Sequence, residues 1–148
     1  MSPFTVNPEV MDKIRPMITA DCPRVAELHA LAMGTSLWAQ LGQRFLREIY
    51  RSMLQNPNFS GFVYQENGVI EGFIAGSRNS KAMMRSVFFR SGHRLGLAAV
   101  LGLRNPKILK QLLETASYFR HSQAELDIEC LAESLFCSFT PKLRGKRV

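Results

Sequence analysis

The sequence lacks several patterns that would assign a function directly. Its three histidines, His29, His93 and His121, form no HExxH motif, and none lies near a cysteine at the spacing of metal ligands. No GxSxG and no complete GxGxxG occurs, so the nucleophile elbow of hydrolases and the dinucleotide-binding turn are both missing. We therefore expect no metal site, no serine hydrolase and no dinucleotide-binding enzyme.

Paired cysteines and long apolar segments are also missing. Cys22, Cys130 and Cys137 form no CxxC pair, which favours buried free thiols in a reducing compartment. The first 16 residues contain acids and prolines but no apolar core of a signal peptide. The longest uncharged apolar run, Leu95 to Leu103, is about half as long as a membrane span requires. These features predict a cytoplasmic protein.

Acidic residues are scarce between positions 78 and 120. Glu114 is the only acid there, so the segment carries a net charge of +8, whereas the whole chain carries +7. The nine bases of this segment are Arg78, Lys81, Arg85, Arg90, Arg94, Arg104, Lys107, Lys110 and Arg120. Three explanations are open: a solvated helix face, a surface that recruits an acidic substrate or partner, or a helix resting on anionic lipid. Binding to nucleic acid is disfavoured, because aromatic residues do not alternate with the basic residues of this segment.

At 148 residues, with 46% hydrophobic and 21% charged residues, the chain has the size and composition of one globular domain. Asp21 is a predicted helix N-cap, and Asn67-Gly68 supplies the positive φ of a hairpin turn. Gly92 and Gly96 leave open whether one helix or two begins the basic segment. In chain order we expect a strand at 13–18, helices at 21–33 and 43–55, strands at 61–65 and 69–77, a helical insert at about 78–120, and a strand from about 132. This order predicts an α/β (α+β) domain with a mainly antiparallel sheet of about four strands and flanking helices.

The last apolar strand, at 135–139, runs through Pro141 into a basic turn that contains a glycine. A strand that enters such a turn often prepares a helix N-terminus, where backbone N–H groups attract anions. The turn consists of Arg144, Gly145, Lys146, Arg147 and Val148. A solvated basic tail after an edge strand explains the same residues equally well.

Together these features resemble the GCN5-related N-acetyltransferases. Ile14-Arg15-Pro16, followed by a helix from Asp21-Cys22-Pro23, is similar to the opening strand and helix of that family. The hairpin around Asn67-Gly68 is similar to its second and third strands. Residues 132–141 are similar to its fourth strand, and Arg144-Gly145-Lys146 to the start of its acetyl-CoA loop.

The loop of that family follows the pattern Q/R-x-x-G-x-G/A. Arg144 matches its first position, Arg147 stands where its first glycine is usual, and its last position would be residue 149. The resemblance therefore implies that residues 1–148 form a single domain, the N-terminal part of this fold, truncated within the acetyl-CoA loop and carrying the helical insert at about 78–120.

The resemblance implies an acetyl-CoA-dependent N-acetyltransferase that acts on a primary amine of a small molecule or peptide. Glu133 is the implied general base, with Glu129 as second choice. The backbone N–H of Phe139, or Ser138 beside it, would hold the thioester carbonyl. The loop residues Arg144, Gly145, Lys146, Arg147 and Val148 would hold the pyrophosphate. Since the loop lacks its glycines and the helix after it, we expect this isolated chain to be impaired or inactive.

A second hypothesis is a non-catalytic binding module with the same half-fold. It would act through the basic insert, or by pairing its last strand with another chain, because an unpaired strand is a template for such pairing. Both hypotheses predict either a homodimer through the exposed final strand or poor solubility.

Overall fold

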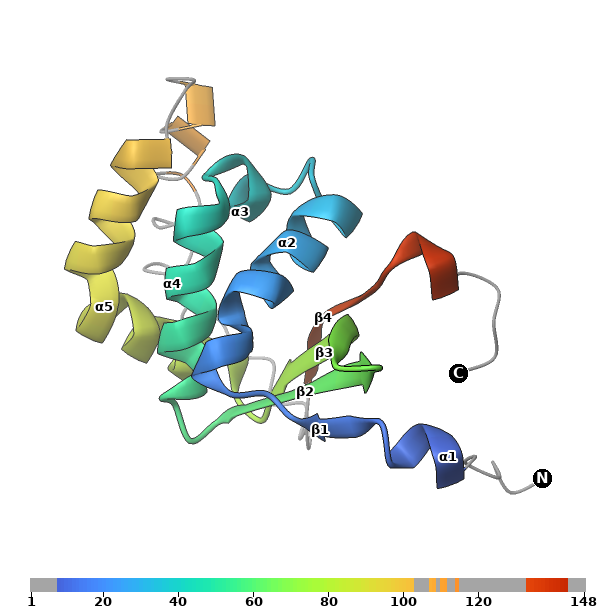
Figure 1. Cartoon of the computed structure of the whole chain (residues 1–148). Helices are drawn as coiled ribbons and strands as arrows, with labels where there is room; N and C mark the ends of the chain where they lie inside the picture. Colours follow the sequence, from blue (N-terminus) through green and yellow to red (C-terminus); the bar gives the residue numbers. More distant parts are fainter. Residues whose placement is uncertain (1–7, 103–106, 109, 112–113, 115–132, 144–148) are drawn as a thin grey trace.

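The computed structural model of the chain describes residues 8–102, 107–108, 110–111, 114 and 133–143 (Figure 1). Within this part four strands form one antiparallel sheet in the order β1-β2-β3-β4. They are β1 (Ile14–Pro16), β2 (Phe59–Glu66), β3 (Val69–Ser77) and β4 (Glu133–Phe139). The predicted antiparallel four-stranded sheet with flanking helices is confirmed, and β1 lies at one edge of the sheet.

The turn between β2 and β3 forms at the predicted residues. Asn67 has a φ of 50° and Gly68 a φ of 79°. Two consecutive positive φ values match the right-handed twist of the strands on either side, and asparagine and glycine are the residues that adopt them most readily. The predicted hairpin is therefore confirmed.

Three long helices accompany the sheet, and all of them lie on its same side. They are α2 (Cys22–Ala32), α4 (Gln43–Leu54) and α5 (Ser80–Gly102). α2 packs on β3 and β4, α4 packs between α2 and α5, and α5 is the outermost of the three (Figure 1). The short elements are α1 (Pro8–Met11), η1 (Thr19–Asp21), α3 (Leu37–Gln40) and η2 (Pro141–Leu143).

α5 is one continuous helix, which resolves the choice between one helix and two at the start of the basic insert. Its buried residues recur every three or four positions, so a single stripe packs against α4. This packing outweighs the low helix propensity of Gly92 and Gly96. The rest of the predicted insert, apart from residues 107–108, 110–111 and 114, lies outside the described residues.

Asp21 does not cap α2 in the predicted way, because its side chain forms no capping hydrogen bond there. Its carboxylate instead accepts hydrogen bonds from Arg15, at 2.7 and 2.9 Å, and from the N–H of Ile18. Burial alone would raise the pKa of Asp21, but these hydrogen bonds outweigh it and lower the pKa below its ordinary value. The buried aspartate therefore fastens β1 to the start of α2.

The two faces of the sheet differ in what covers them. Val63, Phe73 and Ser138 pair across three strands on the face toward the helices, and all three are buried. The opposite face, here called the open face, carries Ile14, Phe62, Ile74, Cys137 and Phe139. Four of its large apolar side chains, those of Ile14, Phe62, Ile74 and Phe139, remain between 38% and 45% exposed, whereas Tyr64 on the same face is 6% exposed.

Candidate functional site

β4 contains a β-bulge close to its start. Phe136 pairs with Ala75 and Ser134 pairs with Gly76, so Leu135 is an extra residue without a partner on β3. A bulge bends its strand and increases the local twist, and bulges are common beside functional sites. The strand that the sequence singled out is therefore irregularly paired, as is the β2–β3 ladder, where the register shifts between Tyr64 and Gln65.

The open edge of β4 presents two backbone N–H groups. The N–H of Thr140 donates to the carbonyl of Glu71 directly opposite, at 2.7 Å. Hydrogen-bonded and non-hydrogen-bonded pairs alternate along an antiparallel ladder. The N–H groups of Cys137 and Phe139 therefore point away from β3. β4 is the last strand of the described sheet, so no described strand pairs with these groups.

Phe139 was expected to bind the carbonyl, and its ring lies on the open face. It covers Gly72, where a Cβ atom would overlap the ring, and its centroid lies 6.4 Å from that of Tyr64. A glycine is thus required at position 72, because the ring of Phe139 approaches it too closely for a Cβ atom. The packing of this ring on Gly72 positions the end of β4. The backbone N–H of Phe139 stays accessible at the strand edge.

Ser138 was the second residue expected beside the carbonyl, and it faces the core. Its hydroxyl donates to the carbonyl of Leu28 in α2 at 3.2 Å, and the residue is buried. By the alternation of the ladder its N–H points to β3. Ser138 thus uses its polar groups inside the protein.

Glu133, the expected general base, lies at the exposed start of β4. It pairs with Ser77, and its carboxylate accepts a hydrogen bond from the hydroxyl of Ser80 at 2.5 Å. Ser80 is the first residue of α5, so the carboxylate lies near a helix N-terminus, where negative charge is favoured. At about 3.3 Å per residue, Glu133 lies about 13 Å along the strand from Cys137 and about 20 Å from Phe139.

The end of β4 contains a polar group that the sequence did not indicate. Thr140 is buried, and its Oγ1 has no hydrogen-bond partner among the described residues. A buried hydroxyl without a partner is unusual, since most such groups are paired. The expected pyrophosphate residues, Arg144, Gly145, Lys146, Arg147 and Val148, lie outside the described residues, as does Glu129.

A buried polar pair lies beneath β4. Nδ1 of His29 in α2 lies 2.8 Å from the hydroxyl of Tyr50 in α4, and Phe136 packs its ring 4.9 Å from the imidazole. Burial lowers the pKa of His29 to about 4, so the ring is neutral near pH 7. Burial also raises the pKa of Tyr50 above its ordinary value. Tyr50 is fully buried, and the sequence gave no sign of its contact with His29.

The cysteines differ in their surroundings. Cys22 is buried as predicted, and burial raises the pKa of its thiol to about 11. Cys137 is exposed, so the prediction that it is buried was wrong. It lies on the open face, which no described helix covers. Cys130 lies outside the described residues.

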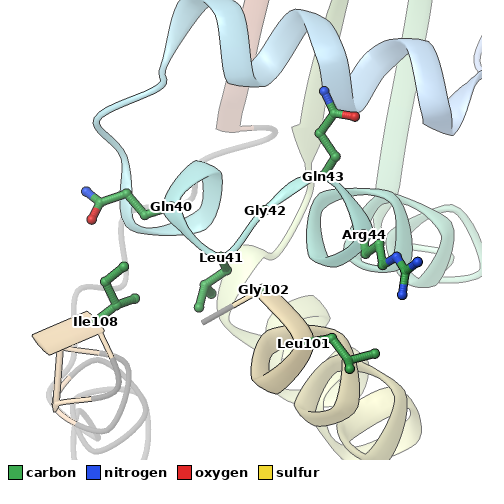
Figure 2. A pocket seen from close by; sticks show the side chains of 8 residues that line it. All are labelled: Gln40, Leu41, Gly42, Gln43, Arg44, Leu101, Gly102 and Ile108. Carbon is green, nitrogen blue, oxygen red and sulfur yellow. The ribbon is translucent and has the colours of Figure 1, made fainter. Parts of the chain in front are cut away.

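A pocket of about 400 Å³ lies where the α3–α4 connection meets the end of α5 (Figure 2). It is lined by Gln40, Leu41, Gly42, Gln43, Arg44, Leu101, Gly102 and Ile108. Arg44 is the only charged side chain among the described residues that line it, and it extends away from Leu41 (Figure 2). These lining residues include no carboxylate, histidine, cysteine or serine that would support catalysis.

The described residues contain no group of three or more His, Cys, Asp or Glu side chains that could hold a metal ion. No helix in the described ranges is long and apolar enough to cross a membrane. Comparisons with protein-family models, with curated proteins and with solved structures found no match to this chain.

Proposed function

We propose that this chain provides the N-terminal half of an acetyl-CoA-dependent N-acetyltransferase, with a primary amine as the acceptor. The observation that carries the proposal is the open edge of bulged β4, where the N–H groups of Cys137 and Phe139 have no described partner. Such N–H groups are suited to a carbonyl oxygen that gains negative charge during acyl transfer. The sequence resemblance to GCN5-related N-acetyltransferases supports the same assignment.

The chemistry requires a base and a carbonyl-binding group. The acceptor is an ammonium group near pH 7, so its nitrogen must lose one proton before it forms a bond to the thioester carbon. As the carbon–sulfur bond then breaks, the sulfur leaves as a thiolate and receives the second proton of the amine. Glu133 accepts the first proton through water, because about 13 Å along the strand separates it from Cys137, and the edge N–H groups bind the carbonyl oxygen.

The distances along β4 favour Cys137 over Phe139 as the carbonyl-binding residue. Both N–H groups point outward, but Cys137 is about 7 Å closer to Glu133 along the strand. A base and a reacting carbonyl must lie within reach of one amine, directly or through water. We therefore add the N–H of Cys137 to the site and omit Ser138, whose hydroxyl already binds Leu28.

The test compares the binding of acetyl-CoA and free CoA by isothermal titration calorimetry. Cys137→Pro removes the outward N–H, and Cys137→Ala retains it while removing the thiol. A proline is tolerated at an edge strand where its nitrogen faces away from the ladder. We expect Cys137→Pro to weaken acetyl-CoA binding roughly two- to tenfold, the value of one hydrogen bond. Cys137→Ala should bind like the wild type.

Free CoA is the matched control, because it has no acetyl carbonyl. Its affinity should not change between the two variants, and circular dichroism should show that both are folded. Equal loss of acetyl-CoA binding in Cys137→Pro and Cys137→Ala would contradict the role of the N–H. No binding of acetyl-CoA to the wild type at millimolar concentration would contradict the proposed function itself.

The same open edge favours a second candidate, a binding module that accepts a strand from another chain. Cys137 and Phe139 expose both backbone donors and acceptors, which is the pattern that β-strand addition uses. A second copy of β4 would then give a homodimer. Light scattering should show a concentration-dependent dimer that Cys137→Pro disrupts and Cys137→Ala does not. A wild-type monomer at every concentration would exclude this candidate.

A further inference from the structure

The outer face of α5 combines bulky apolar side chains with positive charge. Phe89 is 86% exposed, the highest value among the large apolar side chains of the described residues. Leu97, Val100 and Leu101 are each more than 60% exposed on the same helix. Residues this apolar normally lie buried, so their concentration on one helix requires an explanation.

The basic residues of α5 lie among these apolar ones. At 100° per residue, Val100 lies about 20° from Phe89 around the helix, whereas Arg90 and Leu97 lie about 80–100° from Phe89 and within about 20° of each other. The outer face, here called the α5 face, consists of Lys81, Arg85, Phe89, Arg90, Arg94, Leu97, Val100 and Leu101. None of its four cations forms an ion pair with a described residue, and α5 contains no acid.

The position of α5 leaves this face accessible. Its buried residues, among them Met83, Val87 and Leu95, pack against α4. Figure 1 shows α5 at the outer margin of the helical layer, on the far side of α4 from α2. The α5 face therefore lies on the side of α5 that does not pack against α4.

We propose that the α5 face binds the surface of an anionic lipid bilayer. Phe89, Leu97 and Val100 would enter the boundary between headgroups and acyl chains, as apolar residues of interfacial helices do. Arg85, Arg90 and Arg94 would contact lipid phosphates, since their long side chains reach sideways from an inserted helix. Charge complementarity selects an anionic surface over a neutral one.

A nucleic-acid partner would account for the positive charge of the α5 face but not for its exposed apolar side chains. Proteins that bind single-stranded nucleic acid stack the nucleobases on aromatic rings. Contacts to phosphates alone need only basic side chains. Leu97, Val100 and Leu101 have no role in either mode, whereas an acyl-chain boundary accommodates all three. The lipid surface thus explains both components of the α5 face.

The test is co-sedimentation of the full chain with sucrose-loaded vesicles. Vesicles of 70% phosphatidylcholine and 30% phosphatidylserine are compared with pure phosphatidylcholine vesicles, at low and high salt. We expect the chain to sediment with the anionic vesicles at low salt and to be released at high salt, because screening weakens the attraction. Pure phosphatidylcholine should retain little protein.

Two pairs of variants separate the electrostatic and apolar contributions. Arg90→Gln with Arg94→Gln should lower the partition coefficient on the order of thirtyfold. Arg47→Gln with Lys142→Gln removes the same charge from exposed positions outside α5 and should lower it far less. Phe89→Ser should lower it about tenfold, whereas Leu31→Ser, at an exposed position on α2, should not.

The outcomes decide between the explanations. No sedimentation with anionic vesicles at low salt overturns the proposal. So does equal loss in the α5 variants and their controls, which would indicate non-specific charge attraction. Fluorescence anisotropy with a labelled single-stranded oligonucleotide provides the contrast: tight binding that Phe89→Ser leaves unchanged, together with weak vesicle binding, would assign the α5 face to nucleic acid.

Discussion

The two faces of the sheet are built from the same strands and are similarly apolar, yet only one is buried by described residues. Phe73 lies beneath the helices and is 1% exposed, whereas its neighbour Ile74 points to the open face and is 45% exposed. A sheet with one solvated face usually alternates apolar and polar residues. Here Phe62, Ile74 and Phe139 break that alternation, so the open face has the composition of a covered face.

The connections of the chain explain which face the helices occupy. α2 and α4 both lie between β1 and β2 along the chain, and α5 follows β3 and packs on α4. All three helices therefore join one layer. An apolar pattern in a strand therefore indicates only that its residues are suited to burial. Which of the two faces the described helices cover depends on how the chain connects the strands and helices.

Truncation of one residue on each face provides the largest contrast. Phe73→Ala leaves a cavity among fully buried neighbours and should cost about 3–5 kcal/mol of unfolding free energy. Ile74→Ala removes a half-exposed side chain and should cost less than about 1 kcal/mol. Chemical denaturation of both variants checks this. Similar losses would mean that the open face is buried in solution.

Acid should destabilise the helix-covered face through His29. Its folded pKa of about 4 is lower than the unfolded value of about 6.5, so the unfolded state binds the proton more readily. The contribution of neutral His29 to the free energy of unfolding is fully present above about pH 6.5 and is lost progressively as the pH falls towards 4. The loss should reach about 3 kcal/mol, because each pKa unit corresponds to about 1.4 kcal/mol.

Denaturant unfolding between pH 7.5 and 4.5 measures this loss. His29→Gln removes the titrating group, so its stability should depend much less on pH, although it starts lower because the contact with Tyr50 changes. Asp21 acts in the same direction at lower pH, since its pKa is lowered as well. Parallel curves for wild type and His29→Gln above pH 4.5 would show that His29 is not buried in solution.

The sequence predicted the fold more fully than the site. Strands, the Asn67-Gly68 turn and the long helices follow from local pattern, so each could be recognised from neighbouring residues. The open edge of β4 could not be recognised in this way, because it depends on the register in which β4 pairs with β3. The bulge at Leu135 and the hydrogen bond from the N–H of Thr140 to the carbonyl of Glu71 decide which N–H groups point outward. The same register places Cys137 on the open face, where the sequence suggested burial.

Long-range contacts were equally hidden from local pattern. His29 and Tyr50 are separated by 21 residues and meet only when α2 and α4 pack together. Asp21 has the residue type and position of an N-cap, but the guanidinium of Arg15 provides a stronger partner across the β1–α2 connection. In both cases tertiary packing gives a residue a role that its neighbours in the sequence do not indicate.

The smallest test concerns two adjacent residues of β4. Ser138 points into the helix-covered face, where its hydroxyl binds the carbonyl of Leu28, whereas Cys137 points to the open face. Ser138→Ala should therefore cost about 1 kcal/mol, the net value of one buried hydrogen bond, and Cys137→Ala should be nearly neutral. Thermal unfolding of the two variants measures the difference. A larger cost for Cys137→Ala would reverse the assignment of the two faces at β4, and with it the outward direction of the N–H groups on which the proposed acetyl-CoA site depends.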